Sequence, residues 1–323
     1  MKRGLGLLVM LVSLVGTTTA CKTAEKSSKA PPKVTVPTPK VDDGSAGATA
    51  DPWKQQAAKK DPLKAILFWS AEKDGKTTYF LGTMHMGVEP ETRLPQIVWD
   101  KLDAAKTFAM EADISDPKLA KMFMRNGGTL HEDLGDEYWT KLEAAVGPGM
   151  AAQMDRMTPM AAAAMMSLKD LPKTAPMDGV LLGRAMNQKK SIVYLEEGSL
   201  QAAVLMKHMD MKALKMMIDT YAESAAQSKA MLDSYVAGDP DAILKLNDSQ
   251  KADSLKHGYT EAEYEVQMED MLYKRNASWI AGLEKLHAEG NGFVAVGALH
   301  LIGPKSVLDS LANKGFKITR LTP

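Results

Sequence analysis

Four short apolar runs of this 323-residue chain each end in a residue that could bind a metal ion or carry a proton. Two of these residues are histidines, His85 and His300, and two are glutamates, Glu111 and Glu196. Each run has the length and apolar character of a buried strand. In α/β sheets, ligands and catalytic groups gather at the carboxyl ends of parallel strands. If the four runs are parallel neighbours, the four side chains converge on one edge of the sheet.

Both histidines follow their strand in the same pattern, Gly-x-x-His, as residues 82–85 (GTMH) and 297–300 (GALH). A glycine after a strand permits a tight bend or a positive φ, which lets the chain present the imidazole at the rim of the sheet. Two imidazoles and two carboxylates suit Zn²⁺, Mn²⁺ or Co²⁺, and one carboxylate could instead be a general base. From these residues alone, hydrogen-bonded core histidines remain the alternative.

The elements that must position these side chains alternate along the chain. The residues Asp74-Gly75 predict a hairpin between the first two strands, and a final βαβ unit ends the chain. The alternation predicts an α/β fold with a mixed, partly parallel central sheet flanked by helices, with long helical insertions between strands. We expect strands at 65–69, 77–81, 107–110, 191–195, 293–296 and 316–319, and helices near 93–105, 116–168, 177–189, 199–249, 260–289 and 304–313.

The first 20 residues predict a secretory signal peptide: a basic start, an apolar run over residues 5–15 and small residues before Cys21. The run is too short for a transmembrane helix, which needs about 20 apolar residues. The position of Cys21, the sole cysteine, predicts lipid attachment and an exported, membrane-anchored lipoprotein of the cell envelope. Cleavage by an ordinary signal peptidase is the alternative. Lys22, where an aspartate would favour the inner membrane, points towards the outer membrane.

Composition divides the remaining chain into a linker and a domain. Residues 21–61 are rich in Lys, Pro, Ser, Thr, Ala and Gly, and predict a disordered, lipid-anchored linker. Residues 62–323 are long enough for one sizeable α/β domain or two small ones, and we expect one domain, which must hold together without a disulfide. The 40 acidic and 40 basic residues balance, so there is no electrostatic basis for nucleic-acid binding.

The histidine motifs resemble the two signatures of the TraB/GumN family, whose animal relatives include the TIKI proteases. Residues 82–87 (GTMHMG) are similar to its N-terminal signature and residues 293–303 (FVAVGALHLIG) to its C-terminal one. One position departs from the family's pattern: Glu197, directly after Leu195-Glu196, stands where the family usually has threonine. Further family landmarks lie between the signatures in the same order: Met110-Glu111-Ala112-Asp113, Met177-Asp178, Leu195-Glu196 with Gln201, Tyr235 with Gly238-Asp239, and Lys274-Arg275-Asn276.

The resemblance implies a metal-dependent, peptidase-like protein that cleaves peptide bonds at the cell envelope. His85, Glu111 and His300 would then hold a divalent ion, Mn, Co or Zn. The expected partners are a peptide or protein substrate and, through the lipid on Cys21, the membrane.

The same resemblance suggests catalytic roles for three further residues. Glu196 is expected to act as general base and to pass its proton to the leaving amine. Arg275 is expected to offer a fixed cation to the oxyanion or to a substrate carboxylate, with Asn276 as a further donor. A surface charge on a helix is the alternative for Arg275.

A binding protein is the main alternative to an enzyme. The same residues could capture a metal ion, a haem or a peptide without cutting anything. Binding needs ligands but no proton-transferring carboxylate, so a binder would tolerate Glu196→Gln. An ordinary serine or cysteine hydrolase is not expected, because the chain has no Gly-x-Ser-x-Gly motif and its cysteine stands at the leader boundary.

Overall fold

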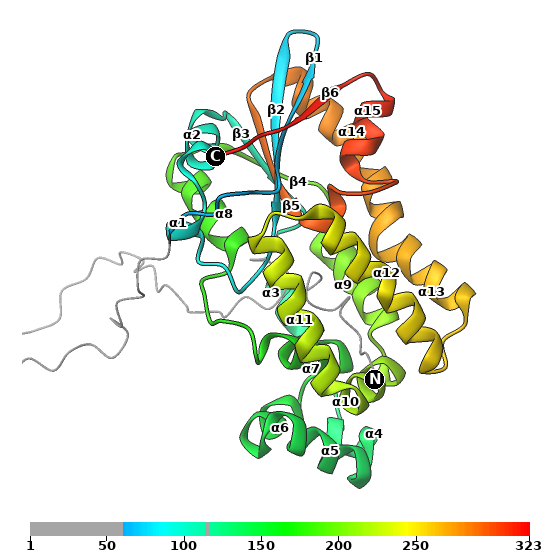
Figure 1. Ribbon diagram of the computed structural model, residues 1–323. Coiled ribbons are helices and arrows are strands. Elements are labelled where there is room, and N and C mark those ends of the chain that lie inside the picture. The colour runs from blue at the N-terminus through cyan, green and yellow to red at the C-terminus, as the bar shows by residue number, and fades with distance from the viewer. Residues whose placement is uncertain (1–60, 114–116) are drawn as a thin grey trace, which may run out of the picture. The chain divides into compact units, whose positions relative to one another are not determined.

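Six strands form one sheet in the computed structural model, which describes residues 61–113 and 117–323 (Figure 1). Each overlaps a predicted strand, but the first begins at Phe68, three residues later than the predicted start at residue 65. The order across the sheet is β4-β3-β5-β2-β1-β6. The strands are β1 (Phe68–Lys73), β2 (Lys76–Thr83), β3 (Thr107–Met110), β4 (Ser191–Tyr194), β5 (Gly292–Gly297) and β6 (Lys317–Arg320).

The sheet is mixed, as predicted. Strands β4, β3, β5 and β2 run parallel to one another, whereas β1 is antiparallel to both β2 and β6. The predicted hairpin joins β1 to β2 through Asp74 and Gly75, which both have positive φ values, 50° and 71°. The expected final βαβ unit is only partly confirmed: its two strands, β5 and β6, run in the same direction but are not neighbours in the sheet. Strand β6 runs parallel to β5 but pairs with β1, so the hairpin β1–β2 lies between them.

Helices cover both faces of the sheet. Helices α2 (Gln96–Ala104) and α8 (Met177–Asn187) lie on one side, and α14 (Lys274–Glu289) and α15 (Val307–Asn313) lie on the other (Figure 1). Right-handed crossovers explain this division. The chain moves towards the β4 edge through α2 and α8, and back towards the β6 edge through α14 and α15.

The remaining helices extend beyond the carboxyl ends of the parallel strands (Figure 1). The two long predicted helical tracts are divided into shorter helices than expected. Gly135 and Gly147 break the first tract, where their φ values of 78° and 88° cannot continue an α-helix. Asp210 caps a new helix in the second tract. The helices beyond the strand ends are α1 (Pro90–Arg93), α3 (Pro117–Met122), α4 (Leu130–Leu134), α5 (Asp136–Val146), α6 (Pro148–Met154), α7 (Pro159–Leu168), α9 (Gly198–His208), α10 (Met211–Asp219), α11 (Tyr221–Val236), α12 (Pro240–Lys256) and α13 (Glu261–Met268). The π-helical turn η2 (Glu269–Tyr273) joins α13 to α14, and the 3₁₀ turn η3 (Ala298–His300) follows β5.

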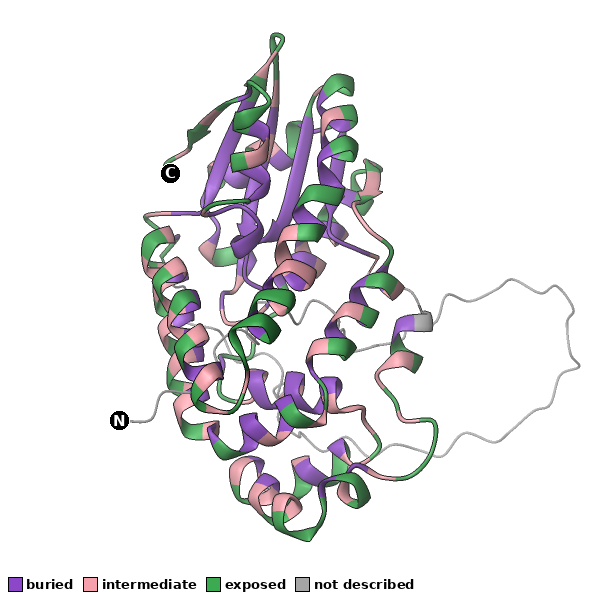
Figure 2. Cartoon of the chain, turned by 90° about the vertical axis from the view of Figure 1, so that its right-hand side faces the viewer, coloured by how far each residue is buried: buried purple, intermediate pink, exposed green. Residues whose placement is uncertain are grey.

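Two apolar clusters hold these elements together. One surrounds the sheet, where β3 and β5 are buried along their whole length (Figure 2). The second lies among α4–α7, α9, α10 and α13 and is rich in methionine and alanine. The candidate site lies at the carboxyl ends of the strands, so rigid, buried strands carry its side chains.

The described residues contain no helix that is long and apolar enough to cross a membrane. The predicted signal peptide, the lipid attachment at Cys21 and all but the last residue of the predicted linker lie outside the described residues. Those three features therefore remain predictions.

Candidate active site

The carboxyl ends of four parallel strands bring the predicted residues to one edge of the sheet. Glu111 directly follows β3, and Glu196 follows β4 by two residues. His85 follows β2 by two residues, and His300 ends the 3₁₀ turn after β5. Because β4, β3, β5 and β2 are consecutive in the sheet, the predicted convergence on one edge is confirmed.

The two Gly-x-x-His turns leave the sheet side by side, since Thr83 pairs with Gly297 in the β2–β5 ladder. Neither motif glycine has a positive φ, so a left-handed conformation is not what requires glycine there. Gly82 is needed for close approach instead. A Cβ atom at this position would lie 3.1 Å from Cα of Ala298 and 3.2 Å from Cβ of Leu67.

The Glu111 carboxylate is buried and fully hydrogen-bonded. Its Oε1 accepts from the backbone N–H of Gly297 (2.8 Å). Its Oε2 accepts from Nε2 of Gln201 (2.8 Å) and from Nη2 of Arg275 (2.7 Å). Burial alone would raise its pKa, but His300, Arg275 and the Gly297 amide together lower the pKa of Glu111 to about 2. The carboxylate is therefore ionised at neutral pH.

The Arg275 guanidinium lies between the two glutamates. It donates from Nε to both carboxylate oxygens of Glu196 (3.0 and 3.1 Å) and from Nη2 to Glu196 Oε1 (2.5 Å). Its Nη1 donates to the backbone carbonyl of Met271 (2.9 Å), inside η2, and faces Nε2 of His300 at 3.3 Å. Together with the Glu111 contact, these interactions engage every nitrogen of the side chain. The alternative of a surface charge is excluded, because Arg275 is buried.

His85 is held by the first turn of α8. Its Nδ1 lies 2.5 Å from Oδ2 of Asp178, and Oδ1 of the same carboxylate accepts from the Thr83 hydroxyl (2.8 Å). The backbone N–H of Met177 donates to the carbonyl of His85 (3.0 Å). Further back, the Tyr235 hydroxyl donates to the carbonyl of Gly82, where the motif begins (2.8 Å). The imidazole is thereby fixed at both its ring and its backbone.

His300 is held in the same way by α14. Its Nδ1 donates to Oδ1 of Asn276 (2.6 Å), while Nδ2 of Asn276 donates to the carbonyl of Lys305 (2.9 Å). The ring lies 4.6 Å from that of Trp279, centroid to centroid. Burial and the neighbouring Arg275 lower the pKa of His300 to about 3, so the ring is neutral. Both ends of the Asn276 amide are used in this way, so the residue orients His300.

The pKa of the Glu196 carboxylate is shifted in the opposite direction from that of Glu111. Burial raises the pKa of Glu196, although its hydrogen bonds to Arg275 act in the opposite direction. The Trp279 indole also lowers it, yet Nε1 of Trp279 makes no hydrogen bond of good geometry. A raised pKa makes the carboxylate a stronger base, which suits a group that takes up a proton.

The donor chemistry fits a divalent ion, although the ligands are not gathered around one point. Among residues 61–113 and 117–323, no three His, Cys, Asp or Glu side chains form a group that could hold a metal ion. His300 Nε2 and Glu111 Oε1 are 3.7 Å apart, with Arg275 beside both. Each histidine nevertheless has an oxygen acceptor at Nδ1, which is the arrangement that histidines binding a metal through Nε2 commonly have.

Three residues for which no role was predicted also lie at this site. Asp178 contacts His85, Gln201 contacts Glu111, and Trp279 packs against His300. Asp178 and Gln201 belong to the ordered landmarks noted in the sequence, which was a usable signal. Trp279 stands four residues after Arg275 on the same helix, and that spacing places both on one helical face.

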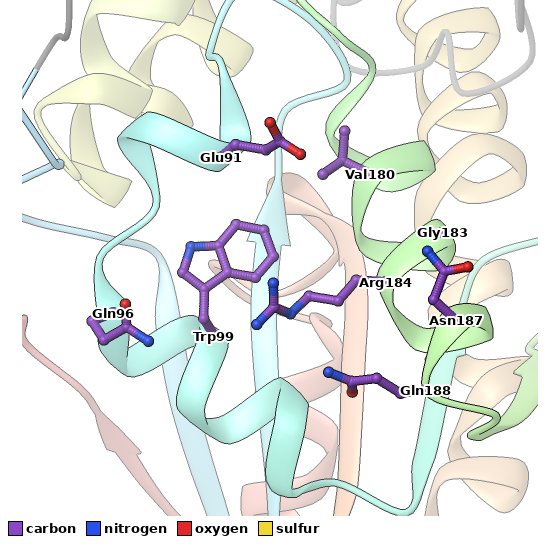
Figure 3. Close-up of a pocket in the computed structure, with 8 residues that line it drawn as sticks. All are labelled: Glu91, Gln96, Trp99, Val180, Gly183, Arg184, Asn187 and Gln188. Carbon is purple, nitrogen blue, oxygen red and sulfur yellow. The ribbon is translucent and has the colours of Figure 1, made fainter.

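A separate polar pocket of about 730 Å³ lies between α1, α2 and α8 (Figure 3). Its Arg184 resembles Arg275 in its contacts. The guanidinium forms a two-point pair with Asp103 (2.7 and 2.6 Å) and lies 4.9 Å from the ring of Trp99. None of the predicted site residues lines this pocket, which makes Arg184 a useful control. The pocket is lined by Glu91, Gln96, Trp99, Val180, Gly183, Arg184, Asn187 and Gln188.

A sheet with this edge cluster defines an α/β protein with a two-histidine, two-glutamate site. Residues 67–320 match the model of the TraB/PrgY/gumN family, and the chain belongs to this family. Two relatives are uncharacterized proteins named YbaP, one from Shigella flexneri and one from Escherichia coli (strain K12). Each is 26% identical to this chain, over 235 and 234 residues respectively, covering 70% of this chain and 84% of the relative. No solved structure matches the chain.

Proposed function

We propose that this protein is a divalent-metal-dependent hydrolase that cleaves peptide bonds at the cell envelope, where a lipid on Cys21 anchors it to the membrane. The observation that carries the proposal is the pair of oriented imidazoles. His85 and His300 follow two adjacent parallel strands. Nδ1 of each ring has an oxygen acceptor, from Asp178 for His85 and from Asn276 for His300. Such outer hydrogen bonds fix the tautomer and the ring direction that a metal ligand needs.

The local charge also supports a cation. Two carboxylates, those of Glu111 and Glu196, pair with the one guanidinium of Arg275, and a third, that of Asp178, pairs with His85. His85, His300 and Glu111 would hold a Mn, Co or Zn ion, with Glu111 already ionised. The bound ion would polarise a substrate carbonyl and lower the pKa of a water molecule towards ~7.

The chain's own residues would manage the proton. Glu196, with its raised pKa, would accept a proton from the attacking water and pass it to the leaving amine. Asn276 would keep His300 in one tautomer through this cycle. The oxyanion role predicted for Arg275 requires it to release one of its present acceptors, because all its nitrogens are engaged.

The test combines metal analysis with a protease assay on the full-length protein and its His85→Ala and His300→Ala variants. About one transition-metal ion per chain is expected, lost in both variants together with peptide cleavage in Mn²⁺, Co²⁺ or Zn²⁺. His131→Ala is the matched control, because His131 is half-exposed and pairs with Asp136 away from the site. Unchanged cleavage in both site variants would exclude the scheme.

One observation favours a second candidate, a protein that binds a metal ion, a haem or a peptide without cutting. Glu196 is held by three hydrogen bonds from Arg275, which restrains it from transferring protons. The Glu196→Gln variant separates the two functions. An enzyme loses turnover while it retains metal, whereas a binding protein shows no turnover before or after the change.

A further inference from the structure

The guanidinium of Arg275 occupies the place where a cation bound to His300 would lie. Nη1 of Arg275 is 3.3 Å from Nε2 of His300. Nε2 is the hydrogen-bond acceptor, because the ring hydrogen is on Nδ1, which donates to Asn276. A metal ion binds an imidazole nitrogen at about 2.0–2.1 Å. An ion at that distance would stand against a guanidinium of the same charge sign, so both cannot be held there at once.

The same side chain also covers the second predicted ligand. Nη2 of Arg275 donates to Oε2 of Glu111 at 2.7 Å, and Gly297 and Gln201 take the other positions on that carboxylate. Arg275 thus blocks metal binding at two of the three expected ligands, His300 and Glu111. With Arg275 in this position, no three metal-binding side chains form a group in the described part of the chain.

We propose that Arg275 is a built-in cation that closes the metal site, and that a divalent ion enters only when Arg275 withdraws from His300 and Glu111. The inference rests on the proposed function, because it takes the ion's ligands from it. Glu196 provides a stable place for the withdrawn side chain, since three of its hydrogen bonds to Arg275 involve neither of the other two residues.

The backbone beside Arg275 supports such a movement. Arg275 follows the π-helical turn η2 by two residues, and Nη1 donates to Met271 within that turn. π-helical turns are rare and occur frequently at functional sites. The Nη1–His300 contact is also the longest that the guanidinium makes, so it is the first to be released when a stronger ligand for His300 arrives.

The test is titration of the full-length protein with Mn²⁺ and Zn²⁺ by calorimetry, comparing the natural protein with Arg275→Lys. Lysine keeps the positive charge but lacks the planar fork, so it cannot span Glu196, Glu111 and His300 together. Arg184→Lys is the matched control, because Arg184 also pairs with a carboxylate and lies over a tryptophan. Circular dichroism confirms that each variant is folded.

The expected result is metal affinity at least about tenfold higher in Arg275→Lys, with Arg184→Lys equal to the natural protein. Equal or weaker binding in Arg275→Lys than in the natural protein overturns the closing role and leaves the proposed metal site intact. Absence of binding in every protein overturns both the closing role and the metal dependence of the proposed function.

Discussion

Nδ1 of His85 lies 2.5 Å from Oδ2 of Asp178, a residue 93 positions further along the chain. Asp178 stands in the first turn of α8, and its other oxygen accepts from the Thr83 hydroxyl, within the same Gly-x-x-His motif. One carboxylate therefore orients both the histidine and the turn that presents it. We expect this residue to be nearly as important for metal binding as His85 itself.

Asp178→Asn should weaken metal binding by about 10- to 100-fold, the usual effect of removing an outer-shell partner of a metal-binding histidine. The amide has the same shape but lacks the charge that favours the Nδ1–H tautomer of His85. Calorimetric titration with Zn²⁺ measures the change. Asp103→Asn, which disturbs a carboxylate paired with Arg184 away from the site, should leave the affinity unaltered. Equal affinities for all three proteins would show that Asp178 does not act on the metal site.

Gly82→Ala should destabilise the protein by about 1–3 kcal/mol, because the added methyl group meets packed neighbours. Its Cβ would lie 3.1 Å from the backbone Cα of Ala298 and 3.2 Å from Cβ of Leu67, neither of which is a flexible side-chain end. Urea unfolding followed by circular dichroism gives the free energy of unfolding. Gly282→Ala is the control, since this α14 glycine has open space around it and the change should be neutral or slightly stabilising. Similar effects at both positions would contradict the close-approach explanation.

Tyr235→Phe should lower the free energy of unfolding by about 1–3 kcal/mol, the usual effect of leaving a buried polar group without its partner. The hydroxyl donates to the carbonyl of Gly82 at 2.8 Å, and both residues are buried. Tyr264→Phe offers a comparison, because its hydroxyl also donates to a backbone carbonyl, that of Asn247, but at 3.4 Å. The Tyr264 variant should lose less stability than the Tyr235 variant. A reversed order would show that hydrogen-bond length does not govern these effects.

The pair formed by Asp103 and Arg184 predicts a pH dependence of stability at low pH. Hydrogen bonds and charge from Arg184 lower the pKa of Asp103 from 3.8 to about 2. A carboxyl group with a depressed folded-state pKa stabilises the protein above its unfolded-state pKa, and the gain is lost as pH falls through the folded-state value. The contribution should be below about 1 kcal/mol, because both side chains are more than a third exposed.

The measurement compares urea unfolding of the natural protein and Asp103→Asn from about pH 6 to about pH 2. The natural protein should be the more stable one above about pH 4, and the difference should disappear as the pH approaches 2. A difference that persists unchanged at the lowest pH would mean that the ionised carboxylate is not its cause.

Much of the site could be predicted from the sequence because its strands are short, apolar and followed directly by the polar side chains. That pattern is local, and the rule that parallel strands present their carboxyl ends at one edge supplied the convergence of His85, Glu111, Glu196 and His300. The mixed, partly parallel sheet and the hairpin at Asp74 and Gly75 follow from equally local signals. The ends of the helices were less predictable, because individual glycines and caps divide long apolar periodic tracts.

Only the tertiary structure decided which groups hold these side chains and what fills the space between them. The contacts of Arg275 with Glu196 and Glu111 bridge 79 and 164 positions, and no spacing in the sequence encodes such pairings. The same is true of the placement of β6 beside β1, which depends on how the whole sheet is ordered. The sequence by itself determined the chemical groups at the strand ends, since local patterns specify strands. Long-range packing determined which carboxylates the predicted Arg275 cation joins, because a buried cation can be placed only where the completed fold brings its carboxylates together.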